Sequence, residues 1–327
     1  MITNYQLEVS HLSLAVPLQG TMVEAVSDVS FRLQAGRVLG LVGESGCGKS
    51  LTAQALLRLG EHQGVQRLSG DIILDGSSLF TMSESELQQV RGGKIAMIFQ
   101  EPMTALNPVF TIGTQIIEVM RLHRTLTAAE AKAKAIALLC DVGMQDAELL
   151  LRQYPDALSG GMRQRVLIAM AMATEPRYII ADEPTTALDV SVQKRIIALL
   201  RRLQSQHQQG MLLVTHDFGL VAEMCDDVAV MYAGQVVETG TVGDIFDNPR
   251  HPYTRALMHC RPEVASAGAS LPVIAGQVPT PGAWPQGCHF ADRCMLADHN
   301  CRLQAIDLNV WHGDRDHQAR CLHGDRA

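Results

Sequence analysis

A glycine-rich segment near the start of the chain has the residue types and spacing of a phosphate-binding loop. It fits the pattern G-x-x-x-x-G-K-[ST] and lies between a predicted strand and a predicted helix. Glycines let backbone N–H groups approach phosphate oxygens closely. Lys49 can reach the β- and γ-phosphates, and the Ser50 hydroxyl can bind Mg²⁺. The expected phosphate-binding residues are Gly43, Glu44, Ser45, Gly46, Cys47, Gly48, Lys49 and Ser50.

Two adjacent carboxylates end an apolar segment later in the chain. Residues 178–181 read as a buried strand that leads directly into Asp182 and Glu183. Asp182 can hold Mg²⁺, directly or through water, and Glu183 is then placed to polarise an attacking water as a general base. By itself such a strand end is ambiguous. Downstream of a phosphate loop, it favours a hydrolytic site.

Further polar residues lie at or beyond other predicted strand ends. Gln100 follows a strand predicted over residues 95–99, and His216 follows one over 211–215. Ligands of open α/β sheets bind outside the carboxyl ends of the strands. Gln100 is therefore expected to contact Mg²⁺ or water, and His216 the γ-phosphate. A lone Gln or His at a strand end is more often structural, so this expectation depends on the whole set of residues.

The elements that must position these side chains alternate between strands and helices. Residues 7–41 read as strands, as do 71–74 and 228–232, whereas a helical pattern follows the loop at 51–57. Residues 112–172 are rich in Ala, Leu, Lys and Gln and read as a helical insertion. From residue 262 the chain becomes rich in proline and glycine, as in a linker or an irregular arm. The alternation predicts α/β architecture.

Length and composition limit the classes of protein that remain. A chain of 327 residues with 47% apolar residues favours one large domain with a small appendage. The net charge of −7 argues against a nucleic-acid binder. No apolar stretch is long enough to span a membrane, and the start lacks the regions of a signal peptide, so we expect a cytoplasmic chain.

Half of the cysteines crowd into the C-terminal tail. In a reducing compartment such a cluster indicates metal binding before disulfides. Thiolates suit an iron–sulfur cluster or structural Zn²⁺, but the paired C-x2-C spacing typical of zinc is absent. The wider spacing favours a cluster, while zinc or no metal stays open. The cysteines are Cys288, Cys294, Cys301 and Cys321; the nearby His289, His299, His312, His317 and His323 are expected to be solvated.

Residues 158–165 resemble the signature motif of ABC ATPases. The order of phosphate loop, Gln100, signature, Asp182-Glu183, Asp189 and His216 also matches that family. The resemblance implies that Ser159 and the N–H groups of Gly160 and Gly161 face the γ-phosphate bound by the opposite subunit, at the start of a helix beginning near Met162. It further places Asp189 in the nucleotide site. Dimerisation is therefore implied.

Other segments resemble the dipeptide and oligopeptide permease type of ABC importer ATPases, which also includes nickel importers. They are residues 100–108, 248–257, 276–279 and 285–294. The resemblance implies a P-loop NTPase of the ABC type, with a β-subdomain, a helical insertion subdomain and a small irregular Cys-rich extension. It implies an ATPase domain over residues 1–258, with its helical subdomain at about 101–172, and an extension over 259–327.

The same resemblance implies an ATP hydrolase that uses ATP and Mg²⁺ to energise an importer of di- or oligopeptides. A nickel or metallophore importer stays open. Implied partners are two permease subunits, a sister ATPase or a second copy, and indirectly a solute-binding protein, with no nucleic acid. The implied location is the cytoplasmic face of the inner membrane. The extension is expected to hold a 4Fe–4S cluster on its cysteines.

One departure from the family and two alternative functions are notable. Family members usually have an aromatic residue that stacks on adenine before the second strand, where this chain has Val16. A soluble ABC ATPase would usually carry coiled-coil insertions or a second cassette, and the chain has neither. A nucleotide-binding regulator without turnover is disfavoured by Glu183 and His216.

Overall fold

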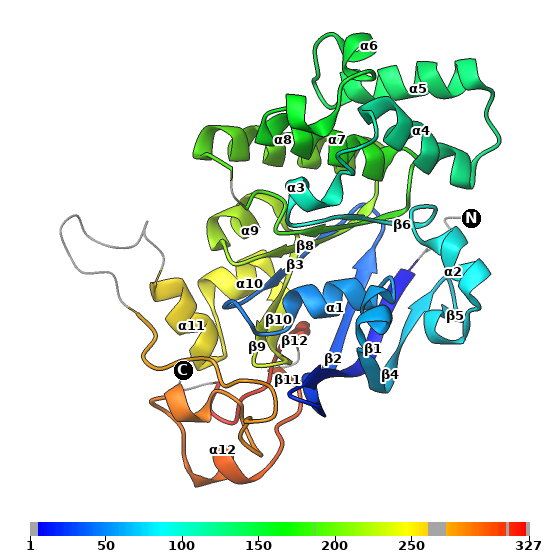
Figure 1. Ribbon diagram of the computed structural model, residues 1–327. Helices are drawn as coiled ribbons and strands as arrows, with labels where there is room; N and C mark the ends of the chain where they lie inside the picture. The colour runs from blue at the N-terminus through cyan, green and yellow to red at the C-terminus, as the bar shows by residue number, and fades with distance from the viewer. Residues whose placement is uncertain (1–5, 187, 261–272, 312–313, 325–327) are drawn as a thin grey trace. The chain divides into compact units, whose positions relative to one another are not determined.

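A computed structural model describes residues 6–186, 188–260, 273–311 and 314–324 (Figure 1). The described residues divide into two compact units. Of the described residues, the first unit contains 34–37, 81–186 and 188–213, and the second contains 6–33, 38–80, 214–260, 273–311 and 314–324. No helix among the described residues is long and apolar enough to cross a membrane.

In the second unit, strand β3 (Val38–Val42) leads into the phosphate loop. All its residues are buried, and it pairs in parallel with β9 (Asp227–Tyr232). Strand β9 turns back into β10 (Gln235–Thr241) through Ala233 and Gly234, which have φ values of 43° and 82°. Two successive positive φ values match the twist of a tight hairpin. The loop that follows β3 is thus held on a buried, continuously apolar strand.

The rest of the second unit surrounds this sheet. Its antiparallel sheet has the order β2-β1-β4-β5, built from β1 (Gln6–Leu18), β2 (Thr21–Gln34), β4 (Gln66–Leu74) and β5 (Ser77–Ser78). Its α-helices before the extension are α1 (Lys49–Ala55), α9 (Phe218–Met224), α10 (Val242–Asp247) and α11 (Pro252–His259). Short 3-10 turns lie at η1 (Leu59–Gln63) and η2 (Leu79–Thr81).

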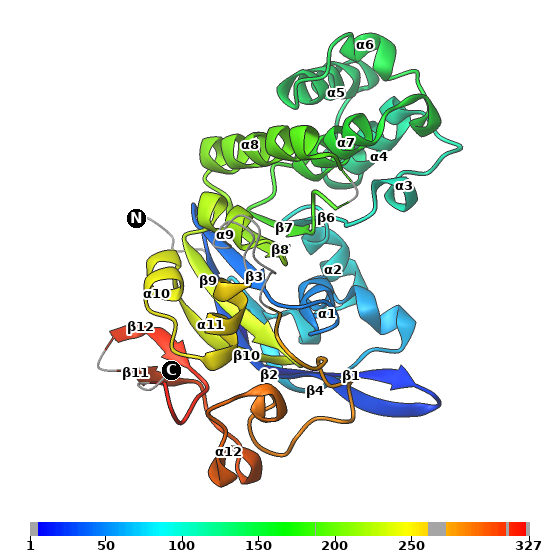
Figure 2. The ribbon, with the colours of Figure 1, turned by 90° about the vertical axis from the view of Figure 1, so that its left-hand side faces the viewer.

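The C-terminal extension is less irregular than its composition predicts. Strand β12 (Asp314–Ala319) pairs with β10, placing Ala319 opposite Glu238, and β11 (Asn309–Trp311) pairs with β12 (Figure 2). The extension also contains η5 (Ala291–Arg293) and helix α12 (His299–Leu303). Unpaired backbone at a sheet edge favours such strand addition. The expected linker over 262–287 lies partly outside the described residues.

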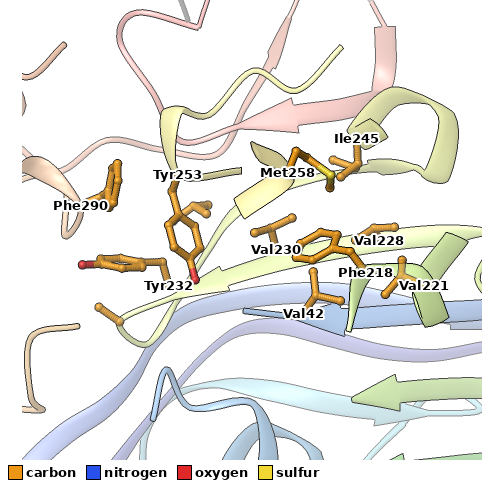
Figure 3. Close-up of a cluster of buried hydrophobic side chains, with 12 residues drawn as sticks. Val42, Phe218, Val221, Val228, Val230, Tyr232, Ile245, Tyr253, Met258 and Phe290 are labelled. Carbon is orange, nitrogen blue, oxygen red and sulfur yellow. The ribbon is translucent and has the colours of Figure 1, made fainter. Parts of the chain in front are cut away.

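A buried aromatic group joins the extension to the core of this unit. The rings of Tyr232 and Tyr253 have centroids 4.6 Å apart, and Phe290 lies 5.2 Å from Tyr232 and 5.3 Å from Tyr253 (Figure 3). These rings come from β9, from α11 and from the turn before η5. Tilted and edge-on aromatic packing adds to the stability gained from buried area. The extension is therefore packed onto the strand that neighbours β3.

The first unit contains the predicted helical insertion. Its strands have the order β8-β7-β6, formed by β8 (Gly210–Thr215), β7 (Tyr178–Asp182) and β6 (Ile95–Ile98), and β6 pairs with β7 in parallel. The division between the units falls within β8. The helices are α2 (Glu84–Val90), α3 (Pro102–Ala105), α4 (Ile112–His123), α5 (Ala128–Asp141), α6 (Ala147–Leu150), α7 (Gly160–Met172) and α8 (Val190–His207), with a turn at η3 (Pro155–Ala157).

Side-chain caps define where the insertion helices begin. The hydroxyl oxygens of Thr111, Thr127 and Ser159 accept backbone N–H groups at the starts of α4, α5 and α7. These helices bury apolar residues such as Ile116 and Leu139 against one another. The predicted strands and the helical insertion are confirmed. Helix α7 begins at Gly160, however, rather than near Met162, because Ser159 serves as its cap.

Candidate functional site

The backbone of the phosphate loop requires glycine at two positions. Gly43 has a φ of 155°, and a Cβ atom there would lie 2.1 Å from the carbonyl oxygen of Met231. Gly48 has a φ of 100°, and a Cβ there would lie 3.1 Å from the carbonyl oxygen of Ala25. L-residues with side chains rarely adopt such conformations. The loop between β3 and α1 is therefore fixed in shape by the strand and hairpin beside it.

Lys49 lies across this loop. Its side chain is buried, and Nζ donates to the carbonyl oxygens of Gly43, at 2.9 Å, and Glu44, at 3.0 Å. Cys47 is also buried, and desolvation by burial raises the pKa of its thiol. The ammonium group is thus held within the loop, where it can meet a phosphate. Ser50 follows in the first turn of α1.

Glu44 is held from two sides by residues from the C-terminal part of the chain. Its backbone N–H donates to the Tyr253 hydroxyl at 2.9 Å. Its carboxylate accepts hydrogen bonds from both terminal nitrogens of Arg293, at 2.8 and 3.1 Å. Sequence reasoning assigned no role to Tyr253 or Arg293, although both lie in segments that carried the family resemblance. Nothing in their spacing indicates a contact with the loop.

In the first unit, Glu183 follows β7 in a strained conformation. Its φ is 44°, which is uncommon for a residue with a side chain and is found preferentially at functional sites. Its Oε2 atom accepts hydrogen bonds of 2.9 Å from the Gln100 side-chain amide and from the Thr186 hydroxyl. Asp182, the last residue of β7, is buried. Gln100, Asp182 and Glu183 are thus brought together as expected, whereas Thr186 was not predicted.

The start of α7, in the signature segment, lies against the start of α8, which Asp189 caps, within the first unit. The Ser159 hydroxyl accepts the N–H of Met162 at 3.4 Å, and a Cβ at Gly161 would lie 2.7 Å from Cγ1 of Val192. Asp189 caps α8 by accepting the N–H groups of Ser191 and Val192, and hydrogen bonds from these residues lower its pKa. Close approach of the two helix starts therefore requires the absence of a side chain at Gly161.

His216 belongs to the second unit and is exposed immediately after the buried strand β8. It directly precedes Asp217, which caps α9 by accepting the N–H groups of Gly219 and Leu220. The cap fixes the turn in which His216 lies. The position matches the expectation of a polar residue beyond a strand end.

The clustered cysteines line one small cavity in the extension. Cys288, Cys294, Cys301 and Cys321 all border it, together with apolar residues that include Phe290 and Ile306. Burial raises the pKa of Cys288 to about 12 and that of Cys321 to about 11. The His323 N–H donates to Cys321 Sγ at 3.3 Å, and the Leu296 and Phe290 N–H groups donate to Cys294 and Cys288.

The histidines of the tail do not all behave as expected. His289 is buried and its Nδ1 lies 2.6 Å from the Ala233 carbonyl oxygen. His317 is buried, and its Nε2 lies 2.8 Å from Oε1 of Glu238. The expectation of solvated side chains is therefore wrong for both: the His289 ring packs 4.8 Å from that of Trp284, and strand addition buries His317. His323 pairs with exposed Asp298, His299 is exposed, and His312 lies outside the described residues.

Two family models match the chain. The model described as "ABC transporter" matches residues 26–186, and that described as "Oligopeptide/dipeptide transporter, C-terminal region" matches residues 237–301. The first match contains the phosphate loop, the signature segment and the Asp182-Glu183 pair. The second contains Tyr253, Arg293 and the first cysteines of the cavity.

Relatives resemble the chain over nearly its whole length. A Brucella melitensis protein, provisionally named as a peptide import ATP-binding protein, is 50% identical over 295 residues, covering 90% of this chain and 89% of that protein. The oligopeptide transport ATP-binding protein AppD of Bacillus subtilis is 44% identical over 295 residues, covering 90% of each chain.

Solved structures share the fold. The ATP-binding cassette MJ0796, in a dimeric post-hydrolysis state with ADP and phosphate, has a TM-score of 0.64 at 23% identity and covers 72% of this chain and 98% of its own. The protein cbiO1 of Clostridium perfringens, part of the transporter complex cbiONQ, also has a TM-score of 0.64, at 25% identity, covering 75% of this chain and 91% of its own.

Proposed function

The chain belongs to the ABC transporter ATP-binding family, and from that premise we propose that it binds and hydrolyses ATP to energise an importer of di- or oligopeptides. The observation that carries the proposal is the joint match of one chain to a cassette model and to the oligopeptide/dipeptide C-terminal model. Peptide is preferred to nickel or a metallophore as cargo because the relatives above are named for peptide transport.

The nucleotide site is proposed from the family order of motifs together with the local geometry of each unit. Lys49 and the loop amides bind the phosphates, and Ser50, Gln100 and Asp182 hold Mg²⁺. Glu183 takes a proton from the attacking water, and Gln100 orients its carboxylate through the hydrogen bond to Oε2. His216 contacts the γ-phosphate. The Mg²⁺ ion supplies charge neutralisation of the triphosphate when it is bound.

A second ATPase chain completes the proposed site. Ser159, Gly160, Gly161 and Asp189 are proposed to face the nucleotide held by the opposite chain. Their support is the open, capped start of α7 beside the start of α8, where backbone N–H groups remain for an anion. A sister ATPase is preferred to a second copy as the partner, following the family. Residues 1–258 are proposed as the ATPase domain and 259–327 as its extension.

The permease subunits are proposed to dock on the first unit, which would place the chain at the cytoplasmic face of the membrane. A hollow of about 690 Å³ there is lined by residues of α4 and α5 and includes Phe110 and Leu122. Of its lining residues, Phe110 and Leu122 expose large apolar side chains. Exposed apolar residues around a hollow suit an apolar helical segment of a partner. The solute-binding protein would act only through the permeases.

The cavity in the extension is proposed to hold a 4Fe–4S cluster. The donor set fits, because all four clustered cysteines line one cavity and backbone N–H groups already donate to their sulfur atoms. Metal binding would also lower the pKa values that burial raises, because the thiolate is the ligand. A cluster would fix the fold of the extension; structural zinc is the alternative that metal analysis decides.

Reconstitution tests the proposed function. The chain is assembled with its permeases and sister ATPase in lipid vesicles, with Mg·ATP inside and a set of di- and oligopeptides outside with the binding protein. We expect ATP-dependent peptide uptake and peptide-stimulated release of phosphate. Hydrolysis stimulated by nickel complexes and not by peptides would contradict the cargo, and absence of ATP binding would contradict the function itself.

A further inference from the structure

An ion pair without an assigned role joins the extension to the phosphate loop. The Arg293 side chain is only 5% exposed, and it makes a two-pronged ion pair with Glu44, the second residue of the loop. Two parallel N–H···O bonds fix both distance and orientation, which a lysine cannot do. Arg293 is therefore built to hold Glu44 in one geometry.

Arg293 is itself fixed by its surroundings. Its Nε donates to the Ala275 carbonyl oxygen at 2.8 Å and one terminal nitrogen donates to that of Ile274 at 3.2 Å. Its guanidinium carbon lies 5.7 Å from the ring centre of Tyr232 and 5.9 Å from that of Phe290. A cation held over aromatic faces and bonded to carbonyl oxygens keeps little freedom. The ion pair thus ties the loop to a rigid part of the extension.

The charge of Glu44 makes this pairing consequential for nucleotide binding. Glu44 contributes a carboxylate to a loop whose function requires affinity for a highly negative triphosphate. Like charges repel at short range, and partial burial strengthens the effect. An unpaired carboxylate would also compete with phosphate for Lys49, which already bonds the Glu44 carbonyl oxygen. Neutralisation by Arg293 removes both effects.

The sequence position of Arg293 links it to the cysteine cavity. It ends the turn η5, which lies between Cys288 and Cys294 and directly precedes Cys294. Tyr253, from α11 just before the extension, holds the backbone of the same Glu44. The C-terminal part of the chain therefore binds both the backbone and the side chain of Glu44.

We propose that Arg293 is a positioning residue for the phosphate loop: it neutralises and orients Glu44, so that the C-terminal extension sets the affinity of the loop for ATP. This proposal rests on the proposed function of the loop. The proposal gives the extension a role in nucleotide binding in addition to its proposed role in metal binding.

The test compares the full chain with the variants R293Q, E44Q and E44Q/R293Q by calorimetric titration with a non-hydrolysable ATP analogue and with ADP, both with Mg²⁺. We expect R293Q to weaken binding of the analogue about tenfold, and ADP less, because repulsion grows with ligand charge. Replacing Glu44 as well should recover most of the affinity, since the unpaired carboxylate is then gone. E44Q alone keeps the Arg293 charge without the carboxylate, so it should bind the analogue no more weakly than the double variant.

The matched control is R302Q, which breaks an exposed ion pair with Asp292 in the same extension and should leave affinity unchanged. If R293Q binds the analogue as tightly as the parent chain, or if the double variant binds it no more tightly than R293Q, the proposal for Arg293 is overturned. The proposed function of the chain would then still stand. A parent chain that binds no nucleotide overturns both. If R293Q fails to fold, R293K takes its place and should bind about threefold more weakly; unchanged affinity there overturns the proposal equally.

Discussion

The side-chain amide of Gln100 donates a hydrogen bond of 2.9 Å to Oε2 of Glu183. The two residues follow neighbouring parallel strands, in which Ile98 lies opposite Ala181. Parallel pairing brings the carboxyl ends of the strands to one edge, so that residues distant in sequence meet. Together with Thr186, Gln100 fixes the carboxylate that is proposed as the general base.

Removing the Gln100 amide should slow hydrolysis without preventing nucleotide binding. We expect Q100A to lower kcat roughly tenfold, because the Glu183 carboxylate loses one of its orienting donors. Affinity for Mg·ATP should fall less than kcat, since Ser50 and Asp182 remain to hold Mg²⁺ and phosphate binding belongs to the loop around Lys49. Steady-state phosphate release and calorimetric titration of the assembled ATPase measure the two quantities. A large loss of affinity with kcat unchanged would contradict the assignment.

Replacing the Glu183 carboxylate should abolish turnover. E183Q keeps the size of the side chain but cannot take a proton, so kcat should fall about 100-fold to 10,000-fold. ATP should still bind, and an ATP-bound dimer should accumulate in size-exclusion chromatography. The control is E175Q, at an exposed residue of the same unit that pairs with Arg124. Turnover of E183Q at the parental rate would show that another group is the base.

Loss of the Lys49 ammonium should weaken nucleotide binding directly. We expect K49A to reduce ATP affinity roughly tenfold or more, because a charge-assisted bond to phosphate is lost in a buried setting. K132A removes an exposed lysine that pairs with Glu148 and serves as the control. Titration with a fluorescent ATP analogue gives the dissociation constants. Equal affinity in K49A and the parent would remove the loop from the nucleotide site.

Metal content distinguishes the possible occupants of the cysteine cavity. Anaerobic purification should yield about four iron and four sulfide per chain, with a brown colour that C294S loses. C294S should also weaken ATP binding, because Arg293 precedes this cysteine. C140S changes an exposed cysteine outside the cavity and should retain iron. About one zinc per chain would indicate a structural zinc site, and a metal-free, colourless protein would contradict metal binding.

Buried His251 should make stability depend on pH. Burial lowers its pKa to about 4, from 6.5 in the unfolded chain, so the unfolded state binds the extra proton. Above about pH 6.5, the contribution of His251 to the free energy of unfolding should not change with pH. Below that it should fall, by roughly 1.4 kcal/mol per pH unit at most, until about pH 4.

The groups around His251 decide the direction of its pKa shift, and its capping role decides which control variant is suitable. Desolvation is the largest cause of the lowered pKa of His251; the charge of Glu238 acts to raise it, and Arg320 lowers it through its charge and raises it through a backbone hydrogen bond. Asparagine can replace the imidazole as the helix cap that accepts the Tyr253 N–H. In chemical denaturation between pH 7 and pH 4.5, the free energy of unfolding of H251N should therefore fall less steeply with decreasing pH than that of the parent chain. Equal slopes in H251N and the parent would assign the pH dependence to other groups.

Most of the nucleotide motifs were readable from the sequence because their chemistry is local. The phosphate loop needs glycines, a lysine and a serine at fixed spacing, and the strand before it is a continuous apolar run. The alternation of strands and helices predicted the α/β architecture, since each element carries its own period, and the composition of residues 112–172 predicted the helical insertion. The family resemblance also placed Ser159 at a helix start, although the helix begins two residues earlier than expected.

Tertiary structure alone decided which distant residues serve those motifs. The Tyr253 hydroxyl accepts the Glu44 N–H although 209 residues separate the two, and His317 is buried only because β12 joins the edge of β10. Arg293 and Glu44 are far apart in sequence, and neither spacing nor composition relates them. A side chain's partner depends on how strands pair and rings pack across the whole fold, and one sequence does not encode that information in any local pattern.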